Sequence, residues 1–188
     1  MTISKIKNES IDRSDITGSV LQVVTSKFQT RLNISTSGNF TKATGFTASI
    51  TPSSTSSKIL VTCNVNIASL SGNYGIGGRL YVNDSHISDA SADDGLGGSN
   101  DEGTWFTAGY QNWSNYARYT ISPQYLHSPN STSAQEYSIY VTNDHVSNGT
   151  VLINRHSYDG TNVAYLYTSK SSWVLQEIVG WQILQVQS

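Results

Sequence analysis

The chain has 188 residues, a formal net charge of −2 at pH 7 and only 13% charged residues. This length fits one domain with one hydrophobic core. An average globular protein has about 25% charged residues, so the surface of this chain is expected to be polar but poor in charge. The sequence has no cluster of lysine and arginine that would contact phosphate groups, and we therefore expect no nucleic-acid partner.

Residues 1–17 are expected to form an N-terminal arm or linker, because their isoleucines are too sparse and irregular for an amphipathic helix. Residues 18–188 are expected to form a single β-sandwich domain. The chain shows neither an apolar signal sequence nor a run near the ~18 apolar residues of a membrane span. We therefore expect no export signal and no membrane insertion.

The clearest strand is predicted at residues 59–67, where apolar and polar residues alternate. Alternation with a period of two is typical of a strand that buries one face. Pro52 is expected to end the preceding strand, at residues 45–50, because proline cannot donate a hydrogen bond within a sheet. Cys63 is the only cysteine and lies on the apolar face of the 59–67 strand, so it is expected to be buried and reduced.

Further strands are predicted with turns between them, and no segment shows the helical period of 3.6 residues. Residues 33–39 are expected to form a loop, and residues 83–84 and 148–149 are expected to form β-hairpin turns. Short strands at this spacing are typical of an all-β, antiparallel sandwich or jelly roll. The further strands are expected at residues 18–28, 74–82, 105–111, 117–126, 136–143, 151–156 and 171–180.

Two of these strands, at residues 18–28 and 171–180, carry apolar residues on both faces. A sandwich buries only one face of each sheet in its own core. The second face of these two strands therefore needs another cover. A symmetric oligomer would supply it, and the alternative is that the isoleucines of residues 1–17 or the segment 181–186 folds over the sheet within one chain.

Five segments occur along the chain in the order GSVLQVV, TGFTASITPSSTSSKILVTCNV, YLHSP, SAQEYSIYV and SSWVLQEI. In this order they resemble a domain that recurs in tail-fibre-like structural proteins of tailed phages, especially marine ones. The resemblance covers residues 18–178, and the run ITPSSTSSKILV is its most specific part. The chain departs from the family pattern because no long fibre shaft precedes residue 18 and ten residues follow residue 178.

The resemblance implies a homotrimeric, antiparallel, jelly-roll-like β-sandwich, similar to tumour-necrosis-factor-type domains, at the end of a fibre. In such trimers the first and last strands lie side by side in the inner sheet. The implied function is that of a phage virion structural protein, of fibre or appendage type, which contacts other virion proteins and binds a receptor protein or glycan on the host surface. The alternative is a capsid decoration or adaptor protein with a purely structural role.

Candidate ligand-binding residues follow the predicted strand at residues 105–111. Trp113 and Tyr116 can stack on the apolar faces of sugars, and Asn112 and Asn115 can exchange hydrogen bonds with sugar hydroxyls. This uncharged set favours a neutral glycan as the ligand. Trp105 and Phe106 begin the strand itself and are expected to belong to the core.

The segment 88–103 is long, rich in glycine and without periodicity. Its acidic residues carry the oxygen ligands that calcium prefers, but their spacing does not match an EF-hand loop. A solvated acidic loop is therefore the main interpretation, and calcium binding is the alternative. Glycoside hydrolysis would need two carboxylates held at a fixed separation, which a glycine-rich loop does not provide. The acidic residues are Asp93, Asp94, Asp101 and Glu102.

The sequence contains no recognisable catalytic motif. Its four histidines lack the spacing of a zinc site and are expected to be surface imidazoles. No nucleophile elbow, phosphate loop or dinucleotide fingerprint occurs. We therefore expect that the protein is not an enzyme and uses no cofactor. The histidines are His86, His127, His145 and His156.

Overall fold

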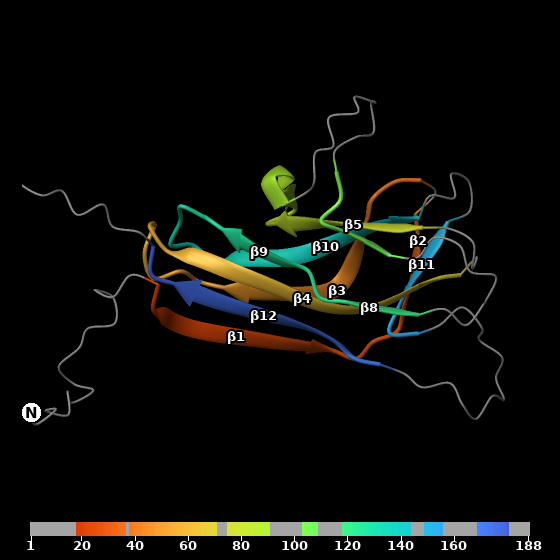
Figure 1. Ribbon diagram of the computed structural model, residues 1–188, viewed down its shortest axis with the longest axis horizontal. Helices are drawn as coiled ribbons and strands as arrows, with labels where there is room; N and C mark the ends of the chain where they lie inside the picture. Colours follow the sequence, from red (N-terminus) through yellow and green to blue (C-terminus); the bar gives the residue numbers. More distant parts are fainter. Residues whose placement is uncertain are drawn as a thin grey trace, which may run out of the picture.

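The computed structural model describes residues 18–36, 38–70, 75–90, 103–108, 118–143, 149–155 and 169–180. In these residues two antiparallel sheets lie face to face (Figure 1). The described residues contain no α-helix and one 3-10 turn, η3 (Ser88–Ala90). The prediction of an all-β, antiparallel sandwich is thereby confirmed. The predicted arm at residues 1–17 and the segment 181–186 lie outside the described residues.

The first sheet is organised around its central strand, β4. Its strands are β1 (Val20–Phe28), β2 (Leu32–Ser35), β4 (Lys58–Ser69), β8 (Tyr119–Ile121), β9 (Gln124–His127), β11 (Thr150–Ile153) and β12 (Ser171–Ile178). Along one edge β4 pairs with β12 and then with β11, and along the other edge it pairs with β9 and then with β8. β1 extends the sheet beyond β12, and β2 extends it beyond β11. The first and last strands therefore lie side by side, next to the central strand.

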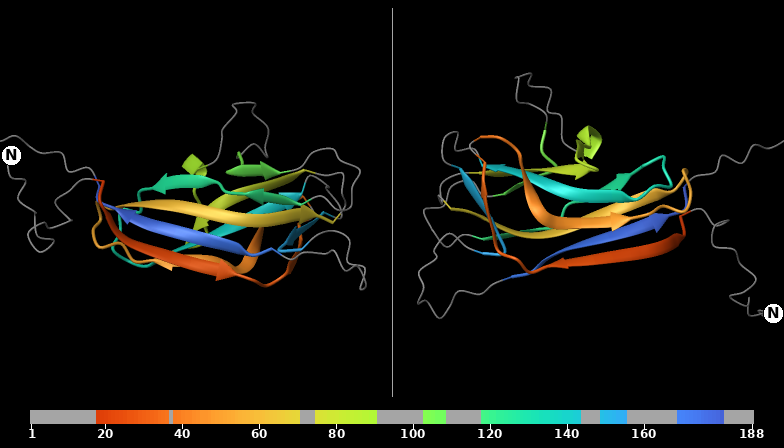
Figure 2. Two further views of the ribbon diagram at one scale, coloured as in Figure 1. Left: turned by 60° about the horizontal axis from the view of Figure 1, so that its bottom comes forward. Right: turned by 180° about the vertical axis from the view of Figure 1, so that it is seen from behind.

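The second sheet packs against the first and has β10 at its centre. Its strands are β3 (Thr41–Ile50), β5 (Ile76–Val82), β6 (Ser85–His86), β7 (Phe106–Ala108) and β10 (Gln135–Asn143). β10 pairs with β3 on one side and with β5 on the other, and β5 also pairs with β6 and β7. The view from behind in Figure 2 brings β3 and β10 to the front.

The strand pairs are nested in the order of the chain. β1 pairs with β12, β3 with β10, β4 with β8 and β9, and β5 with β7. Strands near the two ends of the chain thus pair with each other, and strands near its middle pair with each other. The chain resembles one long β-hairpin that is folded over into two sheets. This connectivity is that of a jelly-roll-like sandwich.

The core lies between the sheets, and the alternation along β4 confirms the predicted face. Ile59, Val61, Cys63, Val65 and Ile67 are all buried, whereas the polar residues between them are only half-buried. The largest core side chains are Trp173 of β12, beside β4 in the same sheet, and Tyr137 of β10, in the facing sheet, and both are completely buried. The side chain of Phe46 packs on Trp173, with 5.2 Å between the ring centroids.

Two hairpin turns predicted from the sequence can be compared with the structure. The hairpin predicted at residues 83–84 is confirmed, since Asn83 and Asp84 have positive φ angles of 49° and 60° and join β5 to β6. The hairpin predicted at residues 148–149 is wrong in its pairing. The strands before and after these residues are β10 and β11, and a hairpin would pair them with each other in one sheet. Instead, β10 belongs to the second sheet, and β11 pairs with β2 and β4 in the first. Residue 148 itself lies outside the described residues.

Two predicted elements also differ from the structure in their extent. Residues 33–39 were expected to form a loop, but residues 33–35 belong to β2, where Ile34 is buried in the core and the backbone pairs with β11. The strand predicted at residues 117–126 is divided into β8 and β9. Pro123 lies at the break, because proline has no N–H to donate to the neighbouring strand.

The burial of Cys63 gives a chemical test of the β4 register. Its side chain is inaccessible, and burial raises the pKa of the thiol well above the usual range. We expect thiol reagents at neutral pH to label the folded protein at least about 100-fold more slowly than the urea-unfolded chain. Equal labelling rates would contradict the assigned register, because a slip of one residue moves every side chain to the other face.

Candidate functional site

The site residues predicted from the sequence lie outside the described residues. These are Trp113, Tyr116, Asn112 and Asn115 for a ligand, and Asp93, Asp94, Asp101 and Glu102 for calcium. The described residues contain no group of three or more His, Cys, Asp or Glu side chains that could hold a metal ion. No helix in this part of the chain has the length and apolar character needed to cross a bilayer. Phe106 is buried in the core and Trp105 packs against it, as expected.

The most specific part of the resemblance, residues 50–61, contains a serine-rich turn that holds a buried carboxylate. Glu177 of β12 is completely buried. Its Oε1 accepts hydrogen bonds from the backbone N–H of Ser53 at 2.6 Å, from the Ser53 hydroxyl at 2.6 Å and from the Ser57 hydroxyl at 2.7 Å. Its Oε2 accepts one from the side-chain amide of Gln22 at 2.7 Å. The turn thus ties β1 and β12 to the start of β4.

The charge of Glu177 is maintained by these donors. Burial alone would raise the pKa of its carboxyl group, but the hydrogen bonds from Ser53, Ser57 and Gln22 together lower it. The carboxylate is therefore ionised at neutral pH and occupied by four hydrogen bonds. A Cβ atom at Gly180 would lie 1.7 Å from the carbonyl oxygen of Ser56, so the chain after β12 also fits closely against the turn. This is a structural anchor, and it leaves no oxygen open to a ligand.

A different feature is the outward face of β1, β12, β4 and β9, which we call the β4 outer face. The strand register places Val23, Gln176, Leu60 and Leu126 side by side across the four strands. Val23 is 52% exposed and Leu126 is 50% exposed. Three of the four side chains in this row are apolar, and Gln176 lies between Val23 and Leu60.

The remainder of the β4 outer face is almost uncharged. Its described residues include no carboxylate, and its two lysines lie at opposite ends of the face. By alternation and register, the outward-facing residues are Val20, Val23, Thr25 and Lys27 of β1; Ser172, Val174, Gln176 and Ile178 of β12; Lys58, Leu60, Thr62 and Asn64 of β4; and Gln124 and Leu126 of β9.

The outward face of the second sheet has the opposite character. Lys42 forms ion pairs there with Asp84 and Glu136. Beside them the rings of Tyr81 and Tyr140 stack with 3.7 Å between their centroids. Exposed ion pairs of this kind are well solvated and contribute little to stability. The β4 outer face differs in having no carboxylate and no ion pair among its described residues, and in exposing Val20, Val23 and Leu126.

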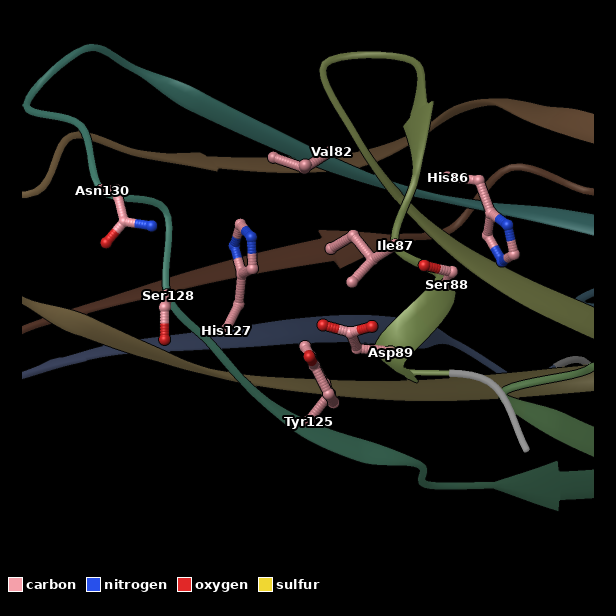
Figure 3. A pocket seen from close by; sticks show the side chains of 9 residues that line it. All are labelled: Val82, His86, Ile87, Ser88, Asp89, Tyr125, His127, Ser128 and Asn130. Carbon is pink, nitrogen blue, oxygen red and sulfur yellow. The ribbon is translucent and has the colours of Figure 1, made fainter. Parts of the chain in front are cut away.

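A pocket of about 390 Å³ lies at the edge of the sandwich, between β9 of the first sheet and the segment formed by β6 and η3 (Figure 3). The side chains of Tyr125 and His127 line it from β9, and Asp89 of η3 faces them from the other wall. Leu126, between the two β9 residues, points to the β4 outer face because neighbouring residues of a strand alternate in direction. The described lining residues are Val82, His86, Ile87, Ser88, Asp89, Tyr125, His127, Ser128 and Asn130.

Burial keeps the ionisable rings of the pocket neutral. His127 Nδ1 shares a hydrogen bond of 2.8 Å with the hydroxyl of Tyr137, which is buried beneath it. Burial and, secondly, the positive charge of Lys58 lower the pKa of His127 from its usual value near 6.5. Burial and the charge of Asp89 raise the pKa of Tyr125. At neutral pH the imidazole of His127 and the phenol of Tyr125 are therefore both uncharged.

The described groups of the pocket can exchange hydrogen bonds with a ligand. The only hydrogen bond from His127 to a described residue goes to Tyr137, so no serine or cysteine nucleophile is activated by it. Asp89 is the only carboxylate among the described lining residues. Glycoside hydrolysis ordinarily needs two carboxyl groups. The pocket instead offers scattered donors and acceptors beside an aromatic ring.

The sequence analysis did not identify this pocket. His86 and His127 were expected to be surface imidazoles, and the structure corrects this, because both are half-buried and line the pocket. His145 and His156 lie outside the described residues. The segment YLHSP did contain a sign of this pocket. Tyr125 and His127 alternate with Leu126 on one short strand, so both rings lie on the same face. The partner wall comes from residues 36 or more positions earlier in the chain, which only the fold brings close.

Comparisons with known proteins give little further information. No protein-family model matches the chain, and no curated protein matches it. Among solved structures it is similar to the D431N mutant VP2 protein of infectious bursal disease virus, determined in T=1 particles, with 12% sequence identity and a TM-score of 0.38. The match covers 85% of this chain and 37% of that chain, so this chain spans little more than a third of the viral protein's length.

Proposed function

We propose that the chain is a virion structural protein of a tailed phage, of fibre or appendage type, and that it binds the host surface as a homotrimer. The observation that carries the proposal is the β4 outer face, a broad sheet surface with an exposed apolar row and almost no charge. The resemblance of residues 18–178 to domains of phage tail-fibre-like proteins supports the placement on a phage particle.

A trimer accounts for the exposed apolar row. Each Å² of apolar surface removed from water contributes about 25 cal/mol, and Val23 and Leu126 are half exposed in the single chain. Three copies around one axis can bring three such faces together without leaving an open edge. β1 and β12 lie side by side in this sheet. The resemblance implies the same arrangement, with the first and last strands side by side in the inner sheet of a tumour-necrosis-factor-like trimer.

Binding without catalysis is the activity we infer for the rest of the surface. That the protein is not an enzyme remains an expectation from the sequence, in which we recognise no catalytic motif. The low charge of the chain supports contacts with neutral partners, either other virion proteins or a receptor or glycan on the host. The same β4 outer face would also suit a capsid decoration or adaptor protein, if another virion protein covered it.

Antibodies against the purified chain test this proposal on intact phage particles. We expect negative-stain images to show label at the tips of fibres or other appendages, and we expect the antibodies to reduce adsorption to host cells. Antibodies from non-immunised animals are the control. Label spread over the capsid with unchanged adsorption would favour the decoration or adaptor role, and particles without label would contradict a virion location.

A further inference from the structure

The pocket between β9 and η3 has the volume of a small-ligand site. Its volume of about 390 Å³ falls within the range of roughly 300–1,000 Å³ that is typical of ligand pockets. It lies at the edge of the sandwich, on the opposite side of β9 from Leu126. A ligand could therefore occupy it while the β4 outer face is covered by other subunits.

Several polar groups in the pocket lack a partner in the described part of the chain. The carboxylate of Asp89 and the amide of Asn130 form no hydrogen bond with any described residue, and neither does Nε2 of His127. The Ser128 hydroxyl accepts a hydrogen bond from Lys58 and can still donate its own proton. These groups supply acceptors and donors on both walls of one small space (Figure 3).

The same space has an apolar side. The ring of Tyr125 lines it from β9, and Ile87 and Val82 line it from the second sheet. Ile87 is buried, and the backbone N–H of Ile87 donates to the carbonyl of Leu80 at 2.9 Å, so this wall is held in place. An aromatic ring with a few convergent polar groups is the usual composition of a site that orients a small ligand.

The charges of the pocket restrict the class of ligand. No lysine or arginine is among the described lining residues, and the nearby ammonium group of Lys58 already donates to Ser128, so a phosphate or sulfate would meet the carboxylate of Asp89. The described lining offers one carboxylate, Asp89, and two imidazoles, His86 and His127, which do not form a metal-binding group, and a hard divalent cation takes several oxygen ligands. A neutral molecule with several hydroxyl groups fits better. Its hydroxyls can donate to Asp89 and accept from Asn130, and its C–H faces can pack on Tyr125.

We propose that this pocket binds one neutral sugar unit of a host-surface glycan. The inference rests on the proposed function in host binding and gives it a site that differs from the aromatic segment containing Trp113 and Tyr116. In this arrangement Asp89 and Asn130 select the hydroxyl pattern, and Tyr125 with Ile87 forms the surface on which the ring lies.

The test uses the full chain, a glycan array and saturation-transfer NMR with a panel of neutral hexoses, deoxyhexoses and N-acetylhexosamines. We expect a signal for at least one neutral sugar, and we expect Asp89→Asn to weaken its binding at least tenfold. Asn130→Gly should also weaken binding, and glycine accepts the positive φ of 49° at this position. Asp84→Asn is the matched control, because Asp84 is an exposed carboxylate five residues from Asp89 that does not line the pocket. It should leave the affinity unchanged.

Four outcomes separate this inference from the proposed function. Sugar binding and cell binding that both fall in Asp89→Asn would support the pocket. Cell binding that persists unchanged in Asp89→Asn and Asn130→Gly would overturn the pocket and leave host binding intact. A chain that binds a sugar through these residues but no host cell would support the pocket and contradict the host-binding role, and the absence of binding to every neutral sugar would overturn the inference.

Discussion

Glu177→Ala is expected to lower the free energy of unfolding by about 3 kcal/mol. The carboxylate of Glu177 accepts four hydrogen bonds, from the backbone and hydroxyl of Ser53, the hydroxyl of Ser57 and the amide of Gln22. Alanine would leave the buried hydroxyl of Ser57 without its acceptor, would remove the acceptor shared by Ser53 and Gln22, and would open space at a buried position. Urea unfolding followed by tryptophan fluorescence would measure the loss.

Two controls separate the hydrogen bonds from the charge. Glu177→Gln retains the volume and one oxygen acceptor, so it should cost less than alanine. Because the folded pKa of Glu177 lies below its unfolded value, the carboxylate contributes its full stability above about pH 4.5 and loses it as the pH falls through the folded pKa. The stability difference between the parent and Glu177→Gln should therefore be constant at pH 6–7 and shrink below pH 4.5. A loss under about 0.5 kcal/mol in Glu177→Ala would contradict the anchoring role.

Val23→Asp and Val174→Asp are expected to prevent assembly of the trimer while the single chain stays folded. Both residues belong to the β4 outer face, and Val174 lies between the completely buried Trp173 and Leu175. In a symmetric assembly each substitution would bury three unpaired carboxylates, at a cost of several kcal/mol. Analytical ultracentrifugation with circular dichroism would record mass and folding together.

Thr44→Asp is the matched control for the interface variants. Thr44 is an exposed residue of β3 in the second sheet, so a carboxylate there should affect neither assembly nor folding. Variants of Val23 and Val174 that assemble like the parent would place the subunit interface elsewhere. Variants that unfold would show instead that the β4 outer face is covered within one chain.

The fold could be predicted where the sequence pattern is local. The alternation at residues 59–67 and the asparagine–aspartate turn at residues 83–84 depend on neighbouring residues alone, and both appear in the structure. The partners of β10 and of β11 could not be predicted, because they depend on which sheet each of these strands joins. β2 was missed for a similar reason, since only one of its four residues is buried and its order comes from pairing with β11.

The functional surfaces could be predicted only in part. Apolar residues on both faces of residues 18–28 and 171–180 indicated an uncovered surface, and the structure shows Val20 and Val23 exposed on β1. The contribution of Leu60 and Leu126 to that surface follows from the order β1, β12, β4, β9 and is not visible in any one segment. The pocket escaped prediction because Asp89 lies in η3 and His127 in β9, which are distant in the chain, and neither residue belongs to a motif.

The mass of the purified chain in solution tests the central claim most directly. Light scattering coupled to size-exclusion chromatography at micromolar concentration is expected to give three times the 20.4 kDa of one chain. The value should stay constant on dilution to the nanomolar range if the β4 outer faces are buried against one another. A mass of one chain across this range would contradict a homotrimer assembled through that face.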